Sequence, residues 1–211
     1  MPVPSFIPQG THFEVRWGMA KRRIVVFSPH PDDAEYGAWG FLNQNRHEEI
    51  TIVLVSGAVD RLHEATNAIF ELGSKIIGLG EIDGFIKANA NLVGYVDTLF
   101  SEADLVLCPF PDDTHSDHRE VAIAIKAGAR RKKVDVLFYA TPSTDLSFAP
   151  NVFVPLTSND REERAKALTQ HETQKHQDYF SESHLGAKDR FWGYRIGVEF
   201  AEPFFAYKII L

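Results

Sequence analysis

Two short clusters of histidine and aspartate stand out in this chain of 211 residues. One occupies residues 28–33 (SPHPDD) and the other residues 111–118 (PDDTHSDH). Imidazole and carboxylate groups are the ligands of zinc hydrolases, which hold the metal with three protein ligands and leave one coordination position open. His30, Asp33 and His118 would supply such a set. The two clusters therefore predict a catalytic metal centre.

The spacing within each cluster assigns different tasks to neighbouring residues. His30 and Asp33 are three residues apart across a tight turn into an expected helix, so both can face one point. The adjacent Asp32 must point elsewhere, which leaves it to support the ligands or to activate water. His115 and His118 are three apart at a second expected helix start and lie on one side of its first turn. One of them can bind metal while the other faces a substrate.

Each cluster follows a short apolar run that is typical of a strand buried on both faces. Such runs alternate with stretches of helical period. The expected strands are residues 24–27, 51–55, 75–79, 105–108 and 134–139, and the expected helices are residues 34–45, 60–72, 91–101 and 116–131. This order predicts a single α/β domain with a Rossmann-like, doubly wound, mostly parallel sheet flanked by helices. Ligands bind at the carboxyl ends of strands in such sheets, so both clusters should meet at one edge.

The alternation of strands and helices does not extend to the two ends of the chain. Three prolines within residues 1–20 predict an extended arm, which leaves residues 21–211 as the domain. Residues 140–157 read as loop, and a charged helix over residues 160–175 would begin at a cap formed by Ser158 or Asn159. A short helix near residues 188–194 and a strand around residues 204–210 complete the expected order.

Composition narrows the possible partners and compartments. The chain has 22 Lys and Arg against 29 Asp and Glu, a net charge of −7, which argues against nucleic acid as a partner. Cys108 is the single cysteine, so no internal disulfide forms and a reducing compartment is favoured. No apolar run approaches the roughly 20 residues of a membrane span, and the first residues do not resemble a secretory signal. We therefore expect no membrane span and a cytoplasmic location.

Each cluster taken alone also fits a purely structural role. The first could be a turn in which Asp32 or Asp33 caps a helix. In the second, Asp112, Asp113 and Asp117 could be solvated acids favoured by a helix dipole. The occurrence of both clusters at the ends of two strands of one sheet favours chemistry over coincidence.

The two clusters resemble the hallmark blocks of a known family. Residues 30–35 (HPDDAE), followed by two glycines, and residues 115–119 (HSDHR) are similar to those of the LmbE-like, or PIG-L, N-acetylglucosamine deacetylases. Weaker similarity extends over most of the chain, including Arg61 and Glu64, residues 166–174 and residues 193–204. The resemblance implies the same α/β fold and a zinc-dependent deacetylase.

The resemblance also implies roles for individual residues. His30, Asp33 and His118 would hold the metal, Asp32 would be the general base, and His115 would steady the oxyanion. These roles agree with the assignment from spacing. The substrate would be an N-acetylated sugar or sugar conjugate, hydrolysed to acetate and a free amine. Iron, cobalt or another divalent transition metal could occupy the same ligands in place of Zn²⁺.

Two further residues have supporting roles in this interpretation. Asp117 would hydrogen-bond an imidazole and fix its tautomer. Arg61 would anchor a hydroxyl or an anionic group of the substrate, although a surface salt bridge explains it equally well. Members of the family often form trimers or hexamers, so a homo-oligomer is expected.

Other functions remain open at this stage. A zinc hydrolase of a phosphoester would need more basic residues near the metal than Arg61 and Arg119 provide, and hydrolysis of a different amide is a further alternative. A non-catalytic sugar-binding relative would have no use for Asp32 as a base.

Overall fold

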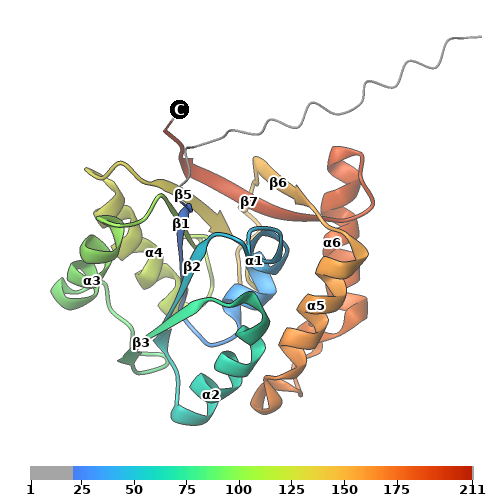
Figure 1. Ribbon diagram of the computed structural model, residues 1–211, viewed down its shortest axis with the longest axis horizontal. Coiled ribbons are helices and arrows are strands. Elements are labelled where there is room, and N and C mark those ends of the chain that lie inside the picture. The colour runs from blue at the N-terminus through green and yellow to red at the C-terminus, as the bar shows by residue number, and fades with distance from the viewer. Residues whose placement is uncertain (1–20, 211) are drawn as a thin grey trace, which may run out of the picture.

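The computed structural model describes residues 21–210 of the chain (Figure 1). Its centre is a seven-stranded sheet with the strand order β3-β2-β1-β4-β5-β7-β6. Strands β1 to β5 are parallel, β7 runs antiparallel to β5, and β6 pairs antiparallel with β7 at the edge. The strands are β1 (Arg23–Ser28), β2 (Glu49–Ser56), β3 (Lys75–Glu81), β4 (Leu105–Pro109), β5 (Asp135–Tyr139), β6 (Val152–Pro155) and β7 (Ala201–Lys208). The arm expected over residues 1–20 lies outside the described residues.

Helices cover both faces of this sheet, as Figure 1 shows. One face packs against α3 and α4, and the other packs against α1, α2 and α5. The helices are α1 (Asp33–Gln44), α2 (Val59–Ala68), α3 (Ala90–Phe100), α4 (Ser116–Ala129), α5 (Ser158–Thr169) and α6 (Glu182–Ile196), with short 3₁₀ turns at Phe70–Leu72, Glu172–Gln174 and Asp178–Phe180. The fold is thus the expected α/β domain with a mostly parallel sheet. Among the described residues, no helix is both long enough and apolar enough to cross a bilayer.

The core forms because successive side chains of a strand point to opposite faces. In β1, Ile24 and Val26 join the core beneath α1 and α2, whereas Val25 and Phe27 join the core beneath α3 and α4. Cys108 is fully buried in the second of these cores, as expected for a small apolar residue. Both faces of the central strands are therefore inaccessible to water. The polar residues that follow these strands lie at the strand ends.

The last third of the chain differs from expectation in several places, and the short helix expected near residues 188–194 is the longer α6 (Glu182–Ile196). Residues 140–157 are not all loop, because Val152–Pro155 form β6 and pair with β7 at the sheet edge. The cap of α5 is Thr157, which exchanges hydrogen bonds with Asp160 in a capping box, and not Ser158 or Asn159. The helix ends at Thr169 instead of continuing to Lys175. A 3₁₀ turn follows and directs the chain back toward α1.

A buried ion pair joins the two late helices. Arg164 of α5 donates two hydrogen bonds to Asp189 of α6, and both side chains are almost completely buried. Removing one partner of such a pair leaves an uncompensated buried charge. Arg164→Met should therefore lower the free energy of unfolding by about 3 kcal/mol, the lower end of the usual range, because Arg161 still lies 3.5 Å from Asp189.

Urea unfolding followed by circular dichroism measures this loss. The control is Arg190→Met, since Arg190 is exposed and lies 3.8 Å from the exposed Glu199. A surface pair of this kind contributes at most about 1 kcal/mol. Equal stability of the Arg164 and Arg190 variants would show that the buried pair is not a structural support.

Candidate active site

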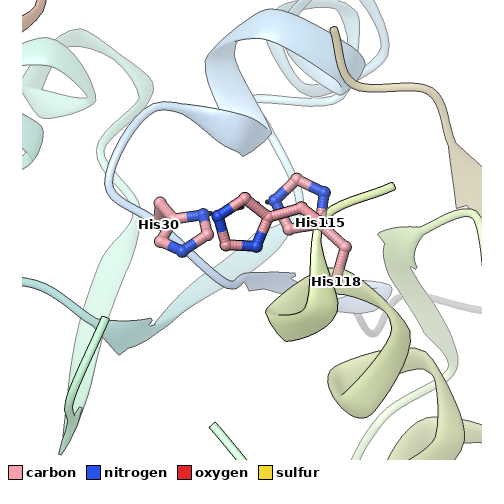
Figure 2. Close-up of side chains that lie close together, drawn as sticks. All are labelled: His30, His115 and His118. Atoms are coloured by element: carbon pink, nitrogen blue, oxygen red, sulfur yellow. Dashed lines mark hydrogen bonds between the residues drawn. The ribbon is translucent and has the colours of Figure 1, made fainter. Parts of the chain in front are cut away.

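Both predicted clusters lie at the carboxyl edge of the sheet, His30 and Asp33 after β1 and His118 after the adjacent strand β4. Nδ1 of His30 lies 3.2 Å from Nε2 of His118. Oδ2 of Asp33 lies 3.3 Å from each of these nitrogens. Figure 2 shows the imidazoles of His30, His115 and His118 gathered where the first turn of α4 faces the loop after β1. Residues 88 positions apart thus place three ligand-type atoms around one point.

The loop after β1 is a tight turn held by its own hydrogen bonds. The hydroxyl of Ser28 donates to the carbonyl of His30 and accepts from the backbone N–H of Ala34. The backbone N–H of His30 donates to Oδ2 of Asp33 at 2.8 Å. The loop after β2 packs directly against this turn, because a Cβ on Gly57 would lie only 2.7 Å from Cγ of Pro31. The side chains of His30 and Asp33 are therefore positioned before any ligand binds.

The outer nitrogens of the two central imidazoles face carboxylates. Nε2 of His30 lies 3.2 Å from Oδ2 of Asp117 and 3.2 Å from Oδ1 of Asp83. Nδ1 of His118 lies 3.0 Å from Oδ2 of Asp113. A carboxylate only accepts hydrogen bonds, so these contacts favour the tautomers whose outer nitrogens carry the hydrogen. The inner nitrogens then direct lone pairs, together with Asp33 Oδ2, toward the same point.

Three converging lone pairs repel one another unless a positive charge lies between them. Ligands at about 2.0–2.2 Å from a tetrahedral zinc lie about 3.3–3.6 Å apart. The spacings of 3.2–3.3 Å among His30, His118 and Asp33 are close to that range. The donor set and its spacing therefore suit a divalent cation.

The pKa shifts within the cluster also agree with a site that binds a cation. Burial opposes the ionisation of Asp33, but the charges and hydrogen bonds of His118 and His30 hold its pKa well below the usual value. Burial would lower the pKa of His118, yet Asp33 and Asp113 raise that pKa to about 10. A positive charge is thus strongly stabilised between these side chains. A metal ion would compete with a proton for this position.

The carboxylate of Asp32 is buried and forms an ion pair with Arg61. Its Oδ2 accepts a hydrogen bond from Nη2 of Arg61 at 3.1 Å, and the same guanidinium lies 3.5 Å from Asp83. Burial, assisted by the charge of Asp33, raises the pKa of Asp32 to about 6. Arg61 is 16% exposed and forms salt bridges with the buried Asp32 and the exposed Asp83, so its ion pairs are only partly at the surface.

His115 caps the start of α4 beside the cluster. Its Nδ1 accepts the backbone N–H of Asp117 at 3.2 Å, so the neutral ring carries its hydrogen on Nε2. Its ring stacks on His118 at a centroid distance of 4.9 Å and meets His30 edge-on at 4.6 Å. Burial and the positive charges of His30 and His118 lower the pKa of His115. A neutral His115 is therefore a hydrogen-bond donor through Nε2.

Sequence reasoning named Asp117 as a partner of an imidazole but missed the other residues that support the site. The sequence suggests a solvated acid at Asp113. In the structure the Asp113 side chain is buried, and it also accepts a hydrogen bond from Thr141 at 2.9 Å. Asp112 is exposed, as expected. On the other flank, buried Glu35 lies 3.1 Å from buried His171. Both members of this second pair lie in blocks that resemble the family, Glu35 in residues 30–35 and His171 in residues 166–174.

Comparisons with known proteins place this arrangement in a family. The family model "PIG-L: GlcNAc-PI de-N-acetylase" matches residues 25–128, a segment that contains both clusters. This segment belongs to the PIG-L (LmbE-like) deacetylase family. A relative of the chain is the uncharacterized deacetylase YaiS of Escherichia coli strain K12. The two are 28% identical over 176 residues, which cover 72% of this chain and 92% of YaiS.

Solved structures with low sequence identity share the fold of this chain. N,N'-diacetylchitobiose deacetylase from Pyrococcus horikoshii has a TM-score of 0.71 and 20% identity, covering 87% of this chain and 83% of that one. GalB, the 4-carboxy-2-hydroxymuconate hydratase of Pseudomonas putida KT2440, has a TM-score of 0.73 and 14% identity, covering 90% and 98%. Since one of these enzymes is a deacetylase and the other a hydratase, the fold alone does not define the reaction.

Proposed function

We propose that this protein is a zinc-dependent hydrolase that removes the acetyl group from an N-acetylated sugar of the N-acetylglucosamine type, or from a sugar conjugate. The observation that carries the proposal is the convergence of His30, His118 and Asp33 on one point with spacings of 3.2–3.3 Å. The PIG-L match of residues 25–128 and the deacetylase names of YaiS and the Pyrococcus enzyme support it.

In this proposal His30, Asp33 and His118 are the metal ligands. Asp117 and Asp113 orient the two imidazoles through their outer nitrogens. A divalent cation bound there lowers the pKa of water and polarises the amide carbonyl. Zn²⁺ suits the ligand set, although other divalent transition metals would fit the same atoms.

Asp32 is the proposed general base. It takes a proton from the attacking water while the water oxygen bonds to the amide carbon, and it later gives that proton to the leaving nitrogen. The C–N bond breaks, and the products are acetate and the free amine. Its pKa of about 6 suits both steps, because the group is mostly ionised near neutral pH and is still basic enough to accept a proton.

His115 is the proposed oxyanion donor. Its Nε2–H can donate a hydrogen bond to the carbonyl oxygen as negative charge develops there. A neutral ring suffices for this role, so the lowered pKa of His115 is compatible with it. Arg61 fixes Asp32 in place through the 3.1 Å contact and can also hold a polar group of the substrate.

We further propose that the enzyme acts on a small molecule in the cytoplasm, as the single cysteine suggests. A homo-oligomer, either a trimer or a hexamer, is proposed from the family resemblance alone. The net charge of −7 argues against a nucleic-acid partner.

A reconstitution assay tests this function. Protein stripped of metal by a chelator should release no acetate from N-acetylglucosamine conjugates, and one equivalent of Zn²⁺ should restore release. Matched amide, phosphoester and hydratase substrates distinguish the reaction types. Phosphoester cleavage or hydration without acetate release would overturn the proposal.

The residue missed by sequence reasoning provides a separate prediction. Asp113→Ala removes the carboxylate that faces His118 Nδ1, so zinc affinity should fall by about 10–100-fold. Competition with a chromophoric chelator measures that affinity. The neighbouring variant Asp112→Ala is the matched control, because Asp112 is exposed and should leave affinity unchanged. Equal affinities of the two variants would contradict the orienting role of Asp113.

A further inference from the structure

We propose that the cavity between α2 and α5 is a binding site for an uncharged sugar, with the indole of Trp39 at its floor. The cavity has a volume of about 620 Å³, and its lining includes Trp39 of α1, Asn67 and Ala68 at the end of α2, and Ala167 and Gln170 at the end of α5. Pockets for small molecules usually have volumes of about 300–1,000 Å³. Because no lining residue belongs to the proposed metal site, this inference is independent of the reaction proposed above.

Three helices form this cavity. Figure 1 shows α2 and α5 side by side on the face of the sheet that also carries α1. Ala68 and Ala167 are small, buried residues of the two walls, so the helices leave space that larger side chains would fill. The backbone N–H and the hydroxyl of Thr173 donate to the two carboxylate oxygens of Glu64 at 2.9 and 2.8 Å. This link ties the segment after α5 to α2 and helps to fix the width of the cavity.

The indole of Trp39 is the observation that carries the proposal. Its side chain is 1% exposed, and its Nε1–H has no hydrogen-bond partner among residues 21–210. A buried donor without an acceptor is unfavourable, and buried indoles usually have a partner. Because Trp39 lines the cavity, an oxygen atom of a ligand that reaches the floor can accept this hydrogen.

The polar groups of the walls suit hydroxyl groups. The side-chain amides of Asn67 and Gln170 each contain a donor and an acceptor, and the carboxylate of Glu71 is an acceptor. A hydroxyl group donates one hydrogen bond and also accepts. A ring with several hydroxyls can therefore satisfy these walls and the Nε1–H of Trp39 together.

The charges of the walls argue against an anionic ligand. Among the described residues that line the cavity, Lys166 is the only cation, and its Nζ already bonds to Glu163 at 2.6 Å. Glu71 adds a second carboxylate. A phosphate or carboxylate in the cavity would be repelled by the excess of negative charge, whereas an uncharged sugar would not. The lining therefore favours a polyhydroxylated ligand without a formal charge.

Nuclear magnetic resonance of ¹⁵N-labelled indoles tests the inference on the zinc-loaded protein. The chain has three tryptophans, and Trp39→Phe assigns the Trp39 signal by removing it. Cellobiose is the probe, because it is an uncharged, polyhydroxylated disaccharide with no acetamide to hydrolyse. Cellobiose should shift the Nε1–H signal of Trp39 in a saturable manner. Inorganic phosphate and spermidine, an anion and a cation, should leave that signal in place.

Two wall variants locate the bound sugar. Asn67→Ala and Gln170→Ala each remove one amide from the cavity, so each should weaken cellobiose binding about five-fold, the usual effect of one hydrogen bond. Asn91→Ala is the matched control, because Asn91 is exposed on α3 at the other face of the sheet. This variant should bind cellobiose as tightly as wild type.

Three results would overturn the inference. An unchanged Trp39 signal at saturating cellobiose would show that the indole has no sugar ligand. A shift with the same affinity in wild type, Asn67→Ala and Gln170→Ala would place the sugar outside the cavity. A response to phosphate or spermidine without one to cellobiose would assign the cavity to a charged ligand. Acetate release does not enter any of these measurements, so failure of the proposed deacetylation would leave the test valid.

Discussion

Asp32→Asn is expected to keep bound zinc and to lower kcat by about 10²–10⁴-fold, the usual contribution of a general base. The amide has nearly the shape of the carboxylate, but it cannot accept a proton at neutral pH. Because Asp32 lies outside the triad of His30, Asp33 and His118, its loss should leave the metal ligands in place. Acetate release and zinc content of the same preparation measure the two effects.

A second aspartate on the same edge of the sheet controls for the loss of one negative charge. Asp60 is exposed on the first turn of α2, and Asp60→Asn should retain full activity. An Asp32→Asn variant as active as wild type would remove Asp32 from the role of base. A variant that loses zinc as well as activity would instead place Asp32 among the ligands.

His118→Ala is expected to lose both zinc and acetate release. The substitution removes one of the three inner donor atoms and leaves Asp113 and Asp33 without the imidazole that they both face. Metal analysis after gel filtration, together with the acetate assay, measures the outcome, and circular dichroism verifies that the variant is folded. His63→Ala is the control, because His63 is exposed on α2 and should change neither quantity. One equivalent of zinc retained by His118→Ala would contradict the ligand assignment.

The central part of the fold could be predicted from the sequence because its strands are buried on both faces. Short runs such as the one in β1 are apolar throughout, and the runs of the first four strands are each followed by a helix. The edge strand β6 gave no such signal. It is only partly buried, it is bounded by Pro150 and Pro155, and its pairing with β7 depends on chain that lies about 50 residues away. Local pattern cannot reveal a strand whose stability comes from a distant partner.

The inner part of the site could also be predicted, whereas only Asp117 could be predicted among the residues that surround it. His30, Asp33 and His118 stand directly at strand ends, so the topology of a parallel sheet brings them together. Asp83 reaches His30 only because the loop after β3 folds across β2, and Glu35 meets His171 from 136 positions away. Contacts of this kind depend on the path of loops, which residue type and spacing do not specify.

One divalent cation should lie between His30, Asp33 and His118. Anomalous diffraction from zinc-loaded crystals, recorded on both sides of the zinc absorption edge, tests it most directly. The account predicts one strong anomalous peak at about 2.0–2.2 Å from Nδ1 of His30, Oδ2 of Asp33 and Nε2 of His118. A peak elsewhere, or zinc-loaded crystals with no peak at these three atoms, would contradict it.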